Sequence, residues 1–416
     1  MIRQYFKQAW RILKENPVLS IITILGTALS ICMIMMRVMT DEVKYGNLAP
    51  ETKRDRMLSV RSVRMGEKKG GNANYSMLGL KLINELILPL QTPEKTAFYS
   101  TGSFSARKPG VIEGKDLFCK MTNEDYWDCF EHEFLFGSPF TEADVKAGSK
   151  KVVIRDKWAK EIFETADAVG KSILLDDIEY IICGVVKTMS SLAHHANSNL
   201  WIPYTAHLQD DGMSYTGGFH SILLAKNPKD FKKIIEEFNE KVDARNANDP
   251  TWDVTFMGQP DTFYVSYYRF DDNNVPDMKA VRTRKLKDYA LYLLIPAINL
   301  ALMTSSRMLQ RRHELGVRRA YGARNAQVFQ QVIWESLLFT IIGAVLGFFL
   351  SLGGMFGLSD ILFNGLNVAS LNLSVWNYLQ PRVFLYAIGF CLLLNLVSAI
   401  IPAVKFSRSN IVNNLK

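Results

Sequence analysis

Residues 18–36 read VLSIITILGTALSICMIMM, nineteen positions without one charged side chain. Three further uncharged runs follow at residues 289–306, 336–359 and 383–404. A helix needs about 20 apolar residues to cross the hydrocarbon core of a bilayer, and it satisfies its backbone hydrogen bonds within the segment. A soluble protein could bury one such run in its core, but four runs in 416 residues are typical of membrane spans. We therefore predict four transmembrane helices.

The net charge of +8 is concentrated beside these runs. Residues 1–17 carry +3, residues 307–335 carry +4 and the tail after residue 404 carries +3, whereas residues 41–288 carry −3. Basic residues flanking spans mark the cytoplasmic side. We expect both termini and the 307–335 loop in the cytoplasm and the 41–288 region outside. A positive surplus of this kind favours a membrane over a nucleic-acid partner.

The large region between the first two runs mixes strand and helix patterns. Residues 57–64 and 151–155 predict strands, and residues 172–186 predict a hairpin that turns at an Asp-Asp pair. Residues 75–88 and 228–245 predict helices, the second with a clear apolar stripe. The predicted fold class is an α-helical membrane protein with four transmembrane helices and a large extracytoplasmic α+β domain between helices 1 and 2.

The first seventeen residues have the pattern of an amphipathic helix. Apolar residues recur at helical spacing on one face, and basic residues occupy the opposite face. Such a helix directly before a span lies in the membrane interface, so we expect Trp10, Phe6 and Arg11 to anchor it. The predicted segments are then a cytoplasmic interfacial helix 1–17, span 18–40, periplasmic domain 41–287, span 288–306, cytoplasmic coupling segment 307–335, span 336–359, periplasmic loop 360–382, span 383–404 and cytoplasmic tail 405–416.

The uncharged runs also carry a packing signal. Gly343 and Gly347 form a G-x-x-x-G pair in the third run, and small residues at this spacing let helix backbones approach closely in lipid. The pair serves either packing within one subunit or a dimer seam. The helical stretch 311–335 is too polar for lipid, and its arginines either bind anionic lipid or dock a cytoplasmic partner.

Residues that could carry catalysis are scattered and do not form a known motif. Gly170-Lys171-Ser172 resembles the end of a phosphate-binding loop, but Thr165 stands where that motif requires glycine. His194 and His195 are adjacent and have no Cys or carboxylate at zinc spacing, which predicts a loop and no metal site. A Cys119–Cys129 bridge remains open. We expect no catalytic site and no cofactor bound by this chain.

Several of these stretches resemble the MacB/FtsX-type permeases of bacterial ABC transporters, the mechanotransmission (type VII) class. Residues 312–323, RHELGVRRAYGA, are similar to the conserved stretch after that family's second span. Residues 134–140, FLFGSPF, and the later strand segments resemble its MacB-like periplasmic core domain in order. His313 stands where the family often has another residue. The resemblance covers essentially the whole chain and implies the layout of one span, one external domain and three spans.

The resemblance also implies partners and coupling residues. Full MacB proteins carry a fused ATPase before the permease, so it implies a separate cytoplasmic ABC ATPase dimer that binds ATP. It implies a second permease subunit, in a homodimer or heterodimer, and membrane lipids around the spans, with or without a periplasmic adaptor. The residues that it implies for ATPase coupling are Arg312, Glu314, Gly316, Arg318, Arg319, Gly322 and Ala323.

The function that follows is a permease subunit of the bacterial cytoplasmic (inner) membrane. It would transmit ATP-driven movement to its periplasmic domain and extrude peptides, antibiotics, lipids or lipoproteins. The alternative with the same architecture is an FtsX-like transmembrane regulator of a periplasmic cell-wall hydrolase. A membrane-anchored enzyme would need catalytic geometry in residues 41–288, and a sensor would need a signalling domain after the last span.

Overall fold

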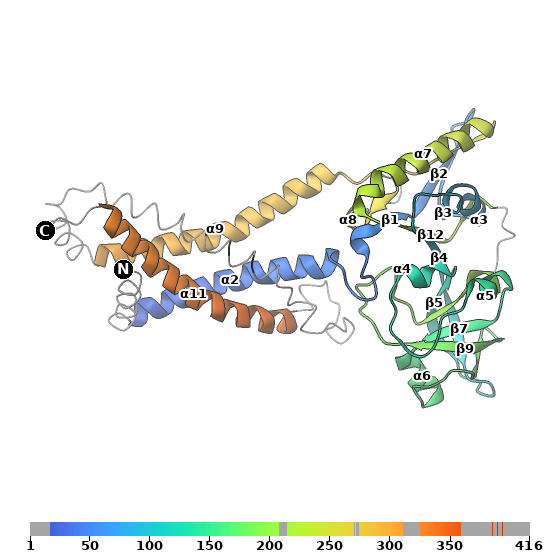
Figure 1. Cartoon of the computed structure of the whole chain (residues 1–416), viewed down its shortest axis with the longest axis horizontal. Coiled ribbons are helices and arrows are strands. Elements are labelled where there is room, and N and C mark those ends of the chain that lie inside the picture. The colour runs from blue at the N-terminus through green and yellow to red at the C-terminus, as the bar shows by residue number, and fades with distance from the viewer. Residues whose placement is uncertain are drawn as a thin grey trace. The chain divides into compact units, whose positions relative to one another are not determined.

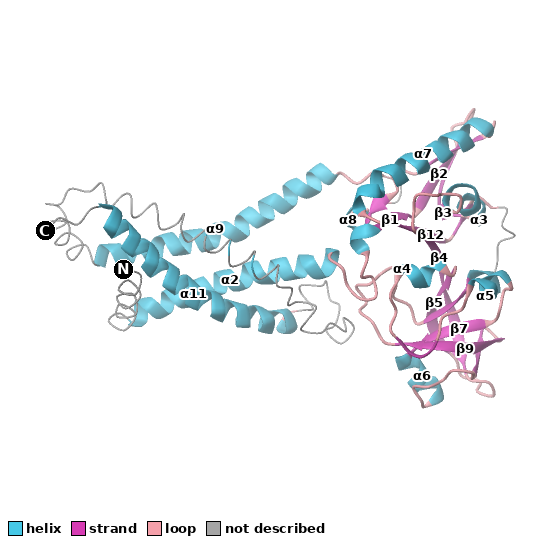
Figure 2. Cartoon of the chain, in the orientation of Figure 1, coloured by secondary structure: helices cyan, strands magenta, loops and turns pink. Residues whose placement is uncertain are grey.

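The computed structural model describes residues 17–207, 214–269, 271, 274–310 and 325–358, together with residues 385, 389 and 393. The chain divides into two compact units. One is made mainly of residues Lys44–Met278, and the other holds Met1–Val43 and most of the chain after Lys279. Figures 1 and 2 show helices in the second unit and a strand-rich first unit.

The helical unit contains three long helices in the described residues. They are α2 (Pro17–Tyr45), α9 (Met278–Gln310) and α11 (Asn325–Gly357). Two segments of them are long and apolar enough to cross a membrane, Ser20–Tyr45 and Leu337–Met355. The second uncharged run, 289–306, lies within α9. The fourth run, 383–404, lies outside the described residues apart from three single positions.

The strand-rich unit is built on a mixed sheet of 14 strands. Six of its strands pair in a closed ring in the order β4, β5, β10, β7, β9 and β8, because β8 bonds to both β9 and β4. Leu117, Ile154, Ile182 and Leu200 are among the buried side chains of this barrel. The strands of the ring are β4 (Lys95–Arg107), β5 (Lys115–Thr122), β7 (Lys151–Arg155), β8 (Ser172–Leu175), β9 (Ile178–Val186) and β10 (Leu200–Pro203).

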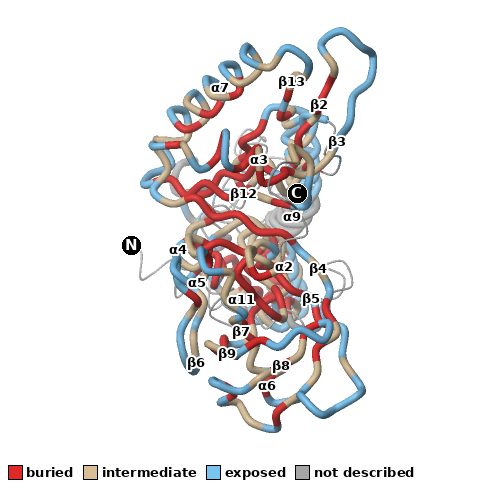
Figure 3. The backbone as a smooth tube through the Cα atoms, turned by 90° about the vertical axis from the view of Figure 1, so that its right-hand side faces the viewer, coloured by how far each residue is buried: buried red, intermediate tan, exposed pale blue. Residues whose placement is uncertain are grey.

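Of the remaining strands, β6 pairs with the barrel strand β9, and the others continue the sheet away from the barrel, where β12 joins the two parts by pairing with β4. They are β1 (Met57–Val60), β2 (Ser62–Glu67), β3 (Ala73–Leu78), β6 (Phe134–Gly137), β11 (Thr216–Gly217), β12 (Phe219–Leu224), β13 (Trp252–Thr255) and β14 (Asp261–Thr262). A second hydrophobic core lies between helix α7 and the strands β1, β2, β3, β12 and β13, and α7 contributes Ile234, Phe238 and Val242. Figure 3 shows the buried segments gathered along the strands, while α7 keeps exposed positions along its length.

The helical elements of this unit are short except for α7. They are η1 (Arg54–Arg56), α3 (Leu80–Leu82), η2 (Ile83–Ile87), α4 (Asp125–Cys129), α5 (Glu142–Lys146), α6 (Asp156–Phe163), η3 (Tyr204–His207), η4 (Pro228–Asp230), α7 (Phe231–Asn248) and α8 (Phe263–Tyr267). A third core, around Tyr126, Phe130 and Trp201, fills the space beside α4. The domain is therefore α+β, as the sequence predicts.

Most of the predicted elements are confirmed. The hairpin forms from β8 and β9, and Asp176 and Asp177 take the left-handed φ values of +46° and +67° that a two-residue turn requires. The strand at 151–155 and the helix after residue 228 are also present. The helix predicted over 75–88 is wrong in its first part, because residues 73–78 pair with β2 as a strand. Only Leu80–Ile87 is helical there, since tertiary pairing overrides the local apolar pattern.

Candidate functional site

The residues predicted for ATPase coupling and for membrane anchoring lie outside the described residues. Arg312, Glu314, Gly316, Arg318, Arg319, Gly322 and Ala323 fall within 311–324, and Phe6, Trp10 and Arg11 fall within 1–16. Their roles therefore stay predictions. The described residues do show how the helices pack and how the chain enters and leaves the strand-rich domain.

Helix α11 packs closely on helix α2 at the two glycines of its G-x-x-x-G pair. A Cβ atom on Gly343 would lie 2.8 Å from Thr27 Cγ2, and a Cβ atom on Gly347 would lie 2.6 Å from the backbone oxygen of Ala28. Neither position has room for a side chain. The structure thus places both glycines against another helix of the same chain.

Contacts further along these helices show their directions. Thr40 donates a hydrogen bond to Met355 Sδ at 3.8 Å, so residue numbers rise together on α2 and α11 and the two helices run parallel. On α9 the numbers fall as those on α2 rise: Arg37 lies over the ring of Tyr289, and Asp41 contacts Lys285. Helices α2 and α9 are therefore antiparallel.

Asp41 joins α2 to α9 through a cluster of polar side chains. The Tyr289 hydroxyl donates a hydrogen bond to Asp41 Oδ2 at 2.6 Å, and Lys285 Nζ lies 3.5 Å from the same oxygen. Arg37, one turn earlier on α2, lies 3.4 Å from Asp41 Oδ1. The Asp41 and Lys285 side chains are mostly buried, which strengthens their attraction because the pair is shielded from water.

A buried ion pair lies where the chain enters the strand-rich domain. Arg54 Nε donates to Glu51 Oε2 at 2.7 Å, and neither side chain is exposed to solvent. The remaining guanidinium nitrogens donate to the carbonyl oxygens of Gly46 and Leu192, at 2.9 and 2.7 Å. A buried charge of this kind is retained only when its hydrogen bonds are satisfied. Arg54 thus fixes the segment after α2 to a loop far along the chain.

The segment through which the chain leaves the domain contacts the same residues. The guanidinium of Arg54 lies 4.4 Å from the ring centroid of Phe263, the first residue of α8. Tyr45, at the end of α2, packs edge-on against Tyr264 and Tyr267 and bonds to the hydroxyl of Tyr268 at 2.5 Å. The chain's two connections to the helical unit are therefore joined inside the domain. We call the residues Tyr45, Glu51, Arg54, Phe263 and Tyr268 the base joint.

A second buried ion pair holds the leaving segment. Arg269 binds Asp261 through two nitrogens, at 2.5 and 3.0 Å, and both side chains are almost fully buried. Burial raises the pKa of Asp261 despite this cation. Arg269 also donates to the carbonyl oxygens of Met257 and Asn274. Strand β14, which contains Asp261, pairs with β1, so the ion pair anchors the leaving segment to the sheet.

The base joint is connected to the barrel through the loop at 188–199. Glu51 Oε1 accepts hydrogen bonds from the backbone N–H groups of His195 and Ala196, at 2.7 and 2.9 Å. The His195 ring bonds to the Tyr99 hydroxyl of β4 at 2.8 Å. Burial holds the pKa of His195 well below its usual value, so its ring is neutral. These bonds connect the base joint to strand β4 through the 188–199 loop.

Lys120 on β5 is a further buried group at this loop. Its ammonium donates to the carbonyl oxygens of His194 and His195 and lies 4.4 Å from the centre of the Tyr99 ring. Burial lowers the pKa of Lys120 to about 7, although the negative charge of Glu51 opposes the shift. His194 and His195 thus belong to a loop, as the sequence predicts. Their carbonyl oxygens accept hydrogen bonds from the Lys120 ammonium.

In the described residues these contacts do not assemble a nucleophile with a base, nor three or more ligands that could hold a metal ion. Cys119 and Cys129, which the sequence allows as a bridge, are free and buried, and burial raises the pKa of both thiols. The described residues thus show two separate attachments: α2 and α9 are joined at Asp41 within the helical unit, and the base joint lies within the strand-rich unit.

Two family models cover most of the chain. One, described as the MacB-like periplasmic core domain, matches residues 20–241, and the other, described as the FtsX-like permease C-terminal, matches residues 289–411. The chain belongs to the MacB/FtsX family of ABC transporter permeases. Family permeases are membrane proteins with a periplasmic domain and work with ATPase partners. The strand-rich unit of this family member corresponds to the periplasmic core domain.

Known proteins similar to this MacB/FtsX-type chain carry transporter names. It is 23% identical over 244 residues to the uncharacterized ABC transporter permease YknZ of Bacillus subtilis, and that match covers 58% of each chain. It is 26% identical over 277 residues to the macrolide export ATP-binding/permease protein MacB of Acinetobacter baylyi. That match covers 64% of this chain. The match spans only 37% of that relative's length.

A solved structure is also similar to this MacB/FtsX-type chain. The periplasmic region of MacB from Actinobacillus actinomycetemcomitans aligns with a TM-score of 0.35 at 15% sequence identity. The alignment covers 48% of this chain and 90% of the other.

The sequence did not indicate that Asp41, Glu51 and Arg54 join separate parts of this MacB/FtsX-type permease. Glu51 and Arg54 are three positions apart, an ordinary spacing for a surface pair, yet they bond to a loop about 140 residues later. Asp41 lies outside the uncharged run 18–36, and the sequence places it in the predicted external domain 41–287. The spacing of Asp41, one helical turn after Arg37 and close to the end of an uncharged run, is the one sequence pattern that could have indicated this pair.

Proposed function

We propose that the chain is the permease subunit of a bacterial ABC transporter. It crosses the cytoplasmic membrane four times, with the 41–287 domain in the periplasm, and transmits the ATP-driven movement of a separate ATPase to that domain. The output is extrusion of peptides, antibiotics, lipids or lipoproteins. ATP is bound by the partner ATPase dimer, and this chain supplies no catalytic site. A second permease subunit completes the assembly, with or without a periplasmic adaptor.

The helix directions support this topology. Helices α2 and α11 are parallel, and α9 is antiparallel to α2, as three successive spans require when each crosses the membrane in turn. The basic residues at 307–335 lie between the second and third uncharged runs, which favours a cytoplasmic position for this coupling segment. The domain then lies on the opposite side of the membrane, after α2 and before α9.

The observation that carries the proposal is the base joint. Both connections to the helical unit are tied together by Arg54 and Tyr45, and the joint is tied to strand β4 through Glu51 and His195. Movement of the Arg312–Ala323 segment would pass along α9, and Asp41 would carry α2 with it. Within the domain, the base joint would pass movement of either connection to the other connection and to strand β4.

Extrusion is favoured over regulation of a cell-wall hydrolase by the relatives. The Acinetobacter baylyi protein is named for macrolide export. The hydrolase alternative predicts the same spans and the same joint, so a co-purifying periplasmic hydrolase would be needed to support it.

Charge reversal in the coupling segment tests the proposal. We expect the double variant R318E/R319E, co-expressed with the cognate ATPase and purified in lipid nanodiscs, to lose both ATPase association and stimulation. A spin label at Lys232, an exposed position on α7, should show an ATP-dependent distance change between two wild-type copies and none in the variant.

The matched control for this double variant is R382E, a charge reversal in the loop predicted on the opposite side of the membrane. We expect R382E to behave as wild type. Normal ATPase association and an unchanged label response in R318E/R319E would refute the coupling role.

A further inference from the structure

Strand β4 has a gap along one of its edges. On one side it pairs with β5 from Tyr99 to Ala106. On the other side it pairs with β12 only up to Ser100 and with β8 only from Ala106 onward. On that side Ser105 bonds to Asp176 through both its N–H and its C=O group. Among the described residues, no strand or turn covers residues 101–104 there, and a gap of four residues spans about 14 Å of an extended chain.

The backbone groups that point into this gap can be identified from their neighbours. Phe98 N–H bonds to the side chain of Asn123, after β5, so even-numbered residues of β4 bond toward β5. Ser105 N–H bonds to Asp176 Oδ1 on the gap side. The Phe118 carbonyl oxygen, opposite Ser103, accepts from Asn199 instead of from β4. Odd-numbered residues of β4 therefore direct their N–H and C=O groups into the gap.

Thr101 and Ser103 thus present two N–H and two C=O groups at the spacing of a β-ladder. Both residues are exposed, and within the described part of the chain these backbone groups have no hydrogen-bond partner. An unpaired strand edge is complementary to one kind of ligand, another extended backbone.

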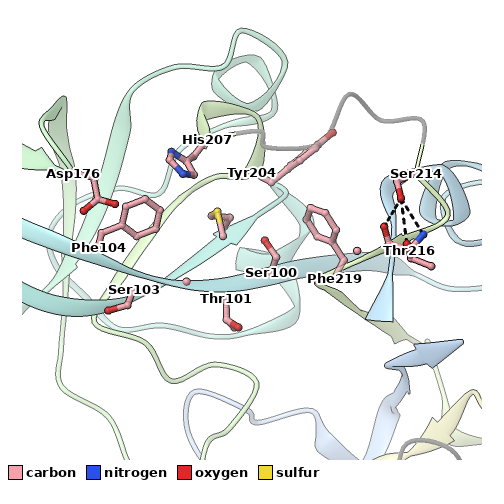
Figure 4. Close-up of a pocket in the computed structure, with 14 residues that line it drawn as sticks. Ser100, Thr101, Ser103, Phe104, Asp176, Tyr204, His207, Ser214, Thr216 and Phe219 are labelled. Atoms are coloured by element: carbon pink, nitrogen blue, oxygen red, sulfur yellow. Dashed lines mark hydrogen bonds between the residues drawn. The ribbon is translucent and has the colours of Figure 1, made fainter. Parts of the chain in front are cut away.

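A cavity of about 530 Å³ lies along this gap. Its walls combine apolar and aromatic side chains with the short residues that precede β12. Figure 4 shows Phe104, Tyr204 and His207 on one side of β4, and Thr101 and Ser103 on the other. The lining residues that contribute apolar surface are Phe104, Met121, Tyr204 and Phe219. An extended peptide would place alternate side chains against this wall.

The ends of the gap define a direction. Strand β8 runs toward the gap and β12 runs away from it, and both are antiparallel to β4. A peptide that continues them has its amino terminus beside Asp176 and its carboxyl terminus beside Phe219. Asp176 is an exposed carboxylate at the cavity wall whose Oδ1 accepts from Ser105 N–H, whereas its neighbour Asp177 pairs with the cationic Arg107. The charge at this end fits a free amino group or a basic side chain.

We propose that this gap is a binding site for an extended peptide of about four residues, added antiparallel to β4 with its amino terminus at Asp176. The ligand is a peptide cargo with a cationic amino end and apolar side chains. This inference rests on the proposed extrusion function and names the class of substrate that the domain would take.

Hydrogen–deuterium exchange, resolved to single amides, tests the site. The full chain in nanodiscs, without ATPase or nucleotide, is saturated with the tetrapeptide Val-Phe-Val-Ala bearing a free amino terminus. We expect the Thr101 and Ser103 amides, which exchange fast in the free chain, to become protected at least tenfold. The same peptide with N-methylated internal amides should give no protection, because it cannot complete the ladder.

Two variants separate the backbone and charge contributions. Thr101→Pro removes an N–H group that the fold does not use, so we expect the chain to fold and peptide affinity to fall about tenfold. D176N should weaken binding of the free-amine peptide about tenfold and leave an N-acetylated peptide unchanged. The matched control is D177N, on the same turn, which should alter neither. If Thr101→Pro does not fold, D176N carries the test.

Unprotected Thr101 and Ser103 amides at saturating peptide, or equal binding of the N-methylated peptide, would overturn the inference. Because the ATPase is absent, such a failure leaves the coupling result for R318E/R319E untouched. Conversely, a chain that binds the peptide but does not associate with an ATPase would keep the site and remove the transport function.

Discussion

The hydroxyl of Tyr289 donates a 2.6 Å hydrogen bond to the carboxylate of Asp41 and so joins two antiparallel helices near one end of an uncharged run. The Asp41 side chain is mostly buried, and a buried carboxylate is costly unless it is paired. Lys285 and Arg37 supply the opposite charges. The cluster is therefore a specific polar attachment between α2 and α9.

The first prediction concerns Asp41→Asn. The amide can still accept from Tyr289 but loses the attraction to Lys285 and Arg37, so we expect an earlier thermal unfolding midpoint of the full chain in detergent. The loss should be about 1.5–3 kcal/mol, the range for hydrogen bonds to charged groups. Tyr289→Phe should lower the midpoint less, because the ion pairs remain. Asp288→Asn, at an exposed position on the same helix, should leave the midpoint unchanged.

The second prediction concerns Gly347→Ala. The new Cβ atom would lie 2.6 Å from the Ala28 carbonyl oxygen, a backbone atom that cannot rotate away, so α2 and α11 must separate. We expect a destabilisation of about 1–3 kcal/mol, typical of overpacking. Thermal unfolding in detergent measures the change. Gly353→Ala is the matched control, since no described atom lies within 4 Å of its added Cβ, and it should be neutral or stabilising. Equal midpoints for the two variants would contradict this packing.

The third prediction concerns Arg54→Met. The substitution leaves Glu51 as an uncompensated buried charge and removes the bonds to Gly46 and Leu192. We expect a destabilisation of roughly 3–5 kcal/mol, as for other broken buried ion pairs. Guanidinium unfolding of the full chain, followed by tryptophan fluorescence, measures it. Lys146→Met removes an exposed pair with Glu142 and should have little effect. In the proposed function, Arg54→Met also uncouples ATPase turnover from movement of the domain.

The local patterns explain what could be predicted from the sequence. The hairpin at Asp176–Asp177 and the helix α7 depend on turn chemistry and on a 3.6-residue period, which a short window contains. The helix predicted over residues 75–88 is wrong at its start, because those residues pair with β2, a contact that the tertiary fold determines. The joint residues were missed for the same reason: the partners of Arg54 and Glu51 lie 138 and 144 residues away.

The last prediction concerns the pH dependence of stability through Lys120. Burial lowers its pKa to about 7 in the folded chain, against about 10.4 in an unfolded one. Between these values the unfolded chain holds a proton that the folded chain has released. The unfolding free energy therefore rises with pH over this window, by up to about 1.4 kcal/mol per unit from this group.

Guanidinium unfolding of the full chain at several pH values between 7 and 10 measures this slope. Lys120→Met cannot titrate, so its slope should be smaller than that of wild type by the Lys120 contribution. Lys233→Met, at an exposed position on α7, should keep the wild-type slope. Identical slopes for Lys120→Met and wild type would mean that the ammonium keeps its proton inside the loop, held there by the carbonyl oxygens of His194 and His195 and by the negative charge of Glu51.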